Sequence, residues 1–227
     1  MNSSEKVKFI SNWIKSYVDQ MPNKAESLVI GISGGIDSSV SSTLSAMTGL
    51  KTIVLSMPIK QKSIQHDLSL AHQKWLKKNF KNVEAQTIEL DDLFKTFQGT
   101  LKNFSNEHGM ANSRARLRMT TLYQVAAANK GIVVGTGNKV EDFGVGFYTK
   151  YGDGGVDISP IADCNKSEVW ELGKELGILK EIIDAPPTDG LWDDGRTDEG
   201  QLGLSYKELE EAMDNENSIN REKYNLI

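Results

Sequence analysis

The chain has 227 residues, with 26 Lys and Arg against 31 Asp and Glu, so its formal net charge is −5. This acidic balance argues against a general nucleic-acid binder, which usually presents a basic face. A single cysteine, Cys164, excludes an intrachain disulfide and a cysteine-rich zinc site. No apolar run approaches the ~20 residues that span a bilayer, and the polar first residues differ from a secretory signal. We therefore expect one cytoplasmic domain over residues 1–227, with neither nucleic acid nor membrane as a partner.

Helix and strand patterns alternate through the first half of the chain. Residues 5–20 carry apolar side chains at helical spacing, and residues 27–32 form an apolar run of strand length. The elements predicted after these are helix 40–47, strand 52–57, helix 63–80, strand 83–88, helix 90–101, helix 112–129 and strand 131–135. Such alternation favours right-handed βαβ units. We predict the α/β class, with a doubly wound parallel sheet and helices on both faces; the alternative is a mixed α+β domain.

The pattern changes after residue 135. Residues 143–161 are rich in Gly and Asp, which predicts mostly loop. Residues 165–177 are expected to form a helix, because Asn165 can cap it and Glu168 stands at the capping-box position. A polar segment then leads to a last short helix at 204–213.

A glycine-rich turn, G-I-S-G-G-I-D-S-S at residues 31–39, follows the first strand and opens a helix. In an open α/β sheet this junction binds phosphates, because the first helical N–H groups point outward. The turn lacks the lysine of a Walker loop and the spacing of a dinucleotide fingerprint. It contains Asp37 instead, and a carboxylate beside phosphates indicates a divalent cation between them, here Mg²⁺. The alternative is a tight turn with Asp37 near a helix start.

A second polar segment is expected at the same edge of the sheet. The strand at 132–134 ends there, so Glu141 or Asp142 could supply a second carboxylate for the metal. Three more charged residues stand in the glycine-rich stretch that follows: Lys150, Asp153 and Asp157. Polar, glycine-rich loops on a rigid scaffold often carry function. The alternative is a disordered surface loop.

Two motifs resemble those of known enzymes. S-G-G-I-D-S-S at 33–39 is similar to the signature of ATP pyrophosphatases, which cleave ATP between the α and β phosphates. T-K-Y-G-D-G-G-V-D at 149–157 resembles the signature of NAD synthetases, and segments 112–119, 157–166 and 186–204 resemble that family in the same order. The resemblance implies an adenine nucleotide alpha hydrolase-like fold and ammonia-dependent synthesis of NAD⁺.

The family resemblance also implies roles for individual residues. Asp37 and Lys166 would be catalytic, and Asp37 and Glu141 would hold Mg²⁺. The residues expected to bind ATP are Gly31, Ile32, Ser33, Gly34, Gly35, Ile36, Asp37, Ser38, Thr136, Lys166 and Thr188. Those expected to bind deamido-NAD⁺, partly across a homodimer interface, are Arg116, Lys150, Asp157 and Lys223.

The implied reaction uses ATP, deamido-NAD⁺ and ammonia. Ammonia rather than glutamine is expected because the chain is too short to add a glutaminase domain, although a separate glutaminase partner stays open. Glu222 stands where the family often has a histidine before the lysine. Because of this departure, a second function stays open, that of another ATP-pyrophosphatase-type ligase that acts on a different carboxylate. A non-catalytic nucleotide-binding relative is the remaining alternative.

Other polar residues are expected to be structural. The three histidines have no spacing that favours a metal trio and are expected to be solvated: His66, His72 and His108. Cys164 is expected to be a small, semi-buried residue, and Trp75 and Trp170 to be core residues. The acid-rich stretch at 189–199 lacks EF-hand spacing and is expected to be a solvated loop.

Overall fold

The computed structural model describes residues 1–60, 63–188 and 196–227, and most of the acid-rich stretch at 189–199 lies outside them. Its described strands form one parallel sheet in the order β3-β2-β1-β4. The strands are β1 Ser27–Gly31, β2 Lys51–Ser56, β3 Val83–Thr87 and β4 Gly131–Val133. The parallel sheet confirms the predicted α/β class, and the mixed α+β alternative is wrong.

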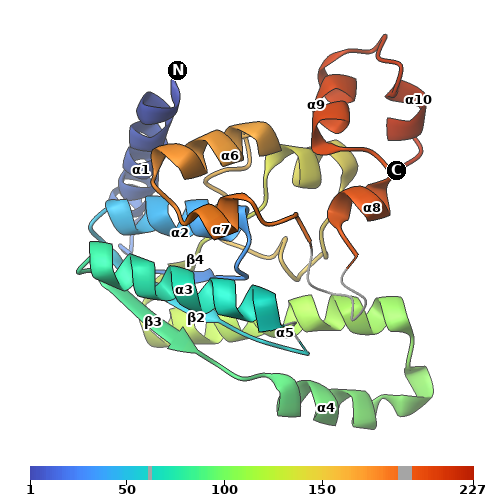
Figure 1. Cartoon of the computed structure of the whole chain (residues 1–227). Helices are drawn as coiled ribbons and strands as arrows, with labels where there is room; N and C mark the ends of the chain where they lie inside the picture. The colour runs from blue at the N-terminus through green and yellow to red at the C-terminus, as the bar shows by residue number, and fades with distance from the viewer. Residues whose placement is uncertain (61–62, 189–195) are drawn as a thin grey trace.

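Helices cover both faces of this sheet (Figure 1). Strand side chains alternate between the faces, so Ile30 and Val54 pack on one side and Val29 and Ile53 on the other. The helices on the first face are α1 Ser3–Gln20, α2 Ile36–Met47, α3 Ser63–Asn79, α6 Lys166–Glu175 and α7 Lys180–Ile183. The other face is covered by α4 Asp91–Thr100 and α5 Glu107–Ala128.

Strand order sets the position of the crevice. From β1 the chain winds outward through β2 to β3, and then returns across the sheet to place β4 on the other side of β1. The connections after β1 and β4 therefore diverge at the carboxyl edge of the sheet, which is where open α/β sheets bind ligands. A bridge between Val134 and Ile158 brings the glycine-rich segment back to this edge.

Helix boundaries differ from the predicted ones mainly at helix starts. α2 begins at Ile36 rather than 40, and α5 at Glu107 rather than 112, because the Asn106 side chain caps it through the Gly109 N–H. The predicted last helix is α9 Tyr206–Asp214. Three short α-helices were not predicted, because five or fewer residues carry no periodic pattern: α7, α8 Asp198–Leu202 and α10 Arg221–Tyr224. The 3₁₀ turn η1 Lys102–Phe104 was not predicted either.

The carboxyl-terminal helices pack on a π-helical turn, η2 Val140–Val145. This contact forms a third hydrophobic cluster, separate from the two sheet faces, whose buried members are Val140, Leu202, Leu204, Tyr206 and Leu209. The Tyr224 hydroxyl also donates to the Gly144 carbonyl at 2.8 Å. α8, α9 and α10 thus support the segment that carries Glu141 (Figure 1).

Burial corrects two expectations, because His72 was expected to be solvated and Cys164 semi-buried, and both are buried. His72 is fully buried rather than solvated, because its Nε2 lies 3.0 Å from the Ser42 hydroxyl and its ring stacks on Trp75. Cys164 is buried, and burial raises the pKa of its thiol to about 11. Trp170 is half-buried at the edge of the core. Among the described residues, no helix is long and apolar enough to cross a membrane.

Because His72 is buried, the stability of the folded chain is expected to fall in acid. Burial lowers its pKa from 6.5 to about 4 in the folded chain, so the neutral ring favours folding above pH 6.5 and this contribution is lost as the pH falls towards 4. Urea unfolding measures the free energy of unfolding of wild type and His72→Gln between pH 6.5 and pH 4. Over that range the wild type should lose up to about 3 kcal/mol more than the variant. If the free energies of unfolding of the two proteins changed equally with pH, burial of a neutral His72 would be contradicted.

Candidate active site

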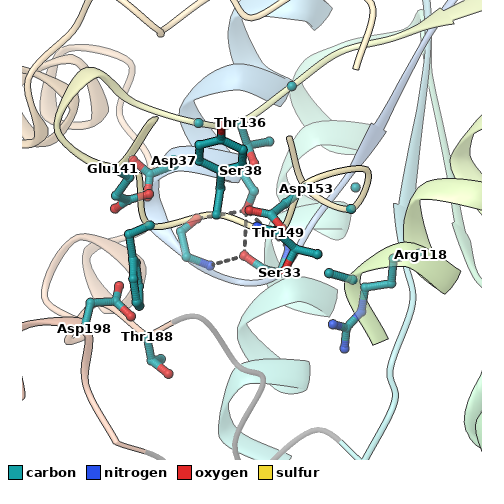
Figure 2. Close-up of a pocket in the computed structure, with 18 of the residues that line it drawn as sticks. Ser33, Asp37, Ser38, Arg118, Thr136, Glu141, Thr149, Asp153, Thr188 and Asp198 are labelled. Atoms are coloured by element: carbon teal, nitrogen blue, oxygen red, sulfur yellow. Dashed lines mark hydrogen bonds between the residues drawn. The ribbon is translucent and has the colours of Figure 1, made fainter. Parts of the chain in front are cut away.

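A pocket of about 590 Å³ opens at the carboxyl edge of β1 and β4. Its walls come from segments far apart in the chain: the turn at 31–38, one face of α5, the segment 134–156 and the start of α6. Figure 2 shows Asp37 and Glu141 on one wall, with Asp198 and Thr188 below them and Arg118 across the cavity. The pocket therefore joins the two polar segments that the sequence analysis singled out.

The turn after β1 holds its shape through its own small side chains. The Ser33 N–H donates to the Ser38 hydroxyl at 3.2 Å, and the Gly35 N–H donates to the Ser33 hydroxyl at 3.1 Å (Figure 2). Gly35 is the N-cap of α2, and no side chain caps that helix end. The helix end facing the pocket is accordingly suited to a phosphate group.

Lys166 joins two carboxylates from distant parts of the chain. Its Nζ lies 2.6 Å from Asp37 Oδ2 and 2.8 Å from Glu141 Oε1, and its side chain is only 3% exposed. Burial alone would lower the pKa of Lys166, but the two carboxylates outweigh burial and raise it, so the ammonium stays charged. Asn138 supports both acids, since its Nδ2 donates to Asp37 at 3.1 Å and its Oδ1 accepts the Glu141 N–H at 3.1 Å.

This pair of carboxylates has the donor chemistry of a Mg²⁺ site. Mg²⁺ is commonly held by one or two carboxylates together with the phosphates of a substrate. Asp37 and Glu141 converge on one point, where they share the Lys166 ammonium. No group of three or more His, Cys, Asp or Glu residues suited to a metal occurs within the described ranges. The arrangement thus fits a cation that arrives with a nucleotide.

Glu141 rather than Asp142 shares the ammonium with Asp37. The Asp142 carboxylate lies against Gly137, where an added Cβ would come within 2.0 Å of Asp142 Oδ2. Burial, helped by the charge of Glu141, raises the pKa of Asp142 to about 6. Of the two acids left open by the sequence, Glu141 has the geometry of a metal ligand beside Asp37.

The residues expected to bind ATP all line this pocket: Gly31, Ile32, Ser33, Gly34, Gly35, Ile36, Asp37, Ser38, Thr136, Lys166 and Thr188. Those expected to bind deamido-NAD⁺ do not. Arg116 Nε donates to the Lys150 carbonyl at 3.2 Å, and Asp157 accepts from the Tyr123 hydroxyl at 3.0 Å. Lys223 contacts the Gly203 carbonyl, at the end of α8.

The sequence analysis missed several pocket residues. Arg118 lines the cavity, and its Nε donates to the Met57 carbonyl at 3.0 Å, while burial lowers its pKa to about 10. Helical spacing could have identified this face of α5, because it lines the pocket with Ala111, Ala115, Arg118 and Leu122. The neighbouring Arg114 stacks over the Phe94 ring of α4, with its guanidinium carbon 5.2 Å from the ring centre.

Comparison with known proteins identifies the family. The family model described as NAD synthase matches residues 6–226. This chain belongs to the NAD synthase family. The family predicted from the motifs is therefore confirmed.

Relatives in this family are similar over most of their length. The NH(3)-dependent NAD(+) synthetase of Carboxydothermus hydrogenoformans is 36% identical over 219 residues, which is 94% of this chain and 86% of the relative. That of Alkaliphilus oremlandii is 38% identical over 226 residues, with the same coverage.

Solved structures of NAD synthase relatives share the fold. NMN synthetase from Francisella tularensis has a TM-score of 0.89 and 35% identity, covering 100% of this chain and 92% of that one. NH3-dependent NAD synthetase from Campylobacter jejuni has a TM-score of 0.77 and 25% identity, covering 100% and 88%.

The backbone conformation of the turn at 31–38 requires glycine at position 34. The φ of Gly34 is +95°, and a Cβ there would lie 2.4 Å from the Gln65 carbonyl oxygen of α3. Gly34→Ala should therefore lower the free energy of unfolding by about 1–3 kcal/mol and weaken ATP binding. Thermal melts and ATP titrations measure both effects.

Gly99→Ala is the matched control, because Gly99 lies within α4 and a Cβ there meets nothing within 4 Å. This variant should be as stable as wild type or about 0.5–1 kcal/mol more stable. A Gly34→Ala protein that melts and binds ATP like wild type would refute the requirement for glycine.

Proposed function

We propose that this chain is an ammonia-dependent NAD⁺ synthetase, a ligase that forms a carbon–nitrogen bond at the expense of ATP. The observation that carries the proposal is the Lys166 ammonium, which lies between Asp37 and Glu141 beside the phosphate-binding turn. Family membership supports the same activity, since the curated relatives are NH(3)-dependent NAD(+) synthetases.

In the first step, the nicotinate carboxylate of deamido-NAD⁺ attacks the α-phosphorus of ATP. An oxygen–phosphorus bond forms, the bond between the α-phosphorus and the bridging oxygen breaks, and pyrophosphate leaves. Negative charge grows on the departing group, and the charged Lys166 with the N–H groups at the start of α2 would stabilise it. Mg²⁺, when held by Asp37 and Glu141, would neutralise part of the phosphate charge.

In the second step, ammonia attacks the acyl carbon of the adenylate. A carbon–nitrogen bond forms, the carbon–oxygen bond to AMP breaks, and the nitrogen releases one proton to water. No side chain has to form a covalent bond with substrate in this scheme. The chain contributes by positioning the reactants and stabilising charge.

We propose a homodimer in the cytoplasm, where ATP and the pyridine nucleotide are available. The four residues expected to bind deamido-NAD⁺ lie outside the pocket of a single chain, which supports a site completed by a second copy: Arg116, Lys150, Asp157 and Lys223. Lys150 and Asp157 are exposed and accessible to such a partner.

A second candidate substrate is the mononucleotide acid, nicotinate mononucleotide. The observation that favours it is the TM-score of 0.89 to the structure described as NMN synthetase from Francisella tularensis, at 35% identity. The chemistry at the carboxylate would be the same. The alternatives differ in kcat/KM, which should be higher for deamido-NAD⁺ if the principal proposal holds.

A reconstituted reaction tests the function directly. Enzyme, Mg-ATP, deamido-NAD⁺ and ammonium should yield NAD⁺, AMP and pyrophosphate in equal amounts, measured by chromatography. Parallel reactions with nicotinate mononucleotide decide the preferred acid. Formation of ADP and phosphate in place of AMP and pyrophosphate would refute the proposed chemistry.

Lys166 is predicted to stabilise the transition state. Lys166→Met removes the ammonium while keeping an unbranched side chain, and should lower kcat at least about 100-fold. Lys174→Met is the matched control, because Lys174 lies on the same helix but is exposed and pairs with Glu171. Steady-state kinetics should leave the control near wild type, and an equal loss in both variants would argue against a role for Lys166 in catalysis.

A further inference from the structure

Tyr206 is a buried residue that contacts the active-site acids but lies outside every motif discussed above. It opens α9, and its side chain is 1% exposed. Its hydroxyl donates to Glu141 Oε1 at 2.6 Å and also lies 3.2 Å from Asp198 Oδ2. Glu141 Oε1 is the same oxygen that accepts from Lys166, so two donors share it.

The surroundings of Tyr206 hold its ring in place. Trp170 packs edge-on, with ring centroids 6.0 Å apart and planes at 89°. The Lys166 ammonium lies 4.7 Å from the centre of the tyrosine ring. Because the ring belongs to the third hydrophobic cluster, its hydroxyl is presented at a fixed position beside Glu141.

Tyr206 also connects Glu141 to the segment that carries Thr188. The Tyr206 N–H donates to Glu199 Oε1 at 3.0 Å, which ties the start of α9 to α8. The Asp198 N–H donates to the Pro187 carbonyl at 3.1 Å. The acid on η2 and the residue next to Thr188 are thereby linked through α8 and Tyr206.

We propose that Tyr206 is a positioning residue that keeps Glu141 oriented towards the metal when Lys166 turns from the carboxylates to the phosphates of ATP. The N–H groups that Lys166 donates to Asp37 and Glu141 cannot at the same time contact the phosphates of ATP. The Tyr206 hydroxyl, in contrast, keeps its hydrogen bond to Glu141 while ATP is bound. This inference rests on the proposed function, since it assigns Glu141 to a metal that accompanies ATP. Partners of metal ligands commonly fix ligand orientation, and their removal weakens metal binding about 10-fold to 100-fold.

The test uses Mn²⁺ and the non-cleavable analogue α,β-methylene-ATP with the full chain. Free Mn²⁺ is measured by electron paramagnetic resonance while the metal is titrated into protein and analogue. Tyr206→Phe keeps the ring and loses the hydroxyl, and should raise the Kd for Mn²⁺ about 10-fold to 100-fold. Its affinity for the analogue without metal should change less than about twofold. Thermal melting confirms that each variant is folded.

Tyr224→Phe is the matched control, because its hydroxyl is also bonded within the same cluster but reaches the Gly144 carbonyl rather than a carboxylate. It should bind Mn²⁺ like wild type. The inference is overturned if Tyr206→Phe binds Mn²⁺ like wild type, or if both variants lose affinity equally. The remaining comparison is between wild type with the analogue and the analogue alone. If the two samples bind the same amount of Mn²⁺, the metal site of the proposed function fails, and the inference fails with it.

Discussion

The candidate active site is organised around one buried interaction, the ammonium of Lys166 shared between Asp37 and Glu141. These residues come from the start of α6, the start of α2 and η2, so one side chain fastens three separate segments. Burying three charges has a large desolvation cost, and such clusters often add little net stability. We infer that the cluster is retained for its chemistry, because it keeps two carboxylates close together and ready to receive a cation.

The fold explains why those segments meet. β1 is an inner strand, and the chain leaves its carboxyl end in one direction and the end of β4 in the other. The divergence opens a crevice whose floor is the turn at 31–38 and whose walls are α5 and the segment after β4. The third cluster then braces η2 from behind, so the position of Glu141 depends on helices near the carboxyl terminus.

Features that depend on local sequence could be predicted. The turn at 31–38 and the four strands follow from glycine placement and apolar runs. At the start of α6 the Asn165 N–H donates to Glu168, which is one of the two hydrogen bonds of the expected capping box. Features that depend on contacts between distant residues could not. Arg118 lines the pocket and Tyr206 contacts Glu141 because of how the helices pack. His72 was expected to be solvated but is buried, because Ser42 and Trp75 enclose it. That Glu141 rather than Asp142 shares the Lys166 ammonium likewise required knowing which way η2 turns.

The measurement that tests this account most directly is a crystal structure with Mn²⁺ and a non-cleavable ATP analogue, in which anomalous scattering locates the metal. The account predicts one Mn²⁺ bound by Asp37, Glu141 and phosphate oxygens, with the triphosphate over residues 31–38 and Lys166 turned to it. A metal bound away from both carboxylates, or a triphosphate that leaves the turn empty, would contradict it.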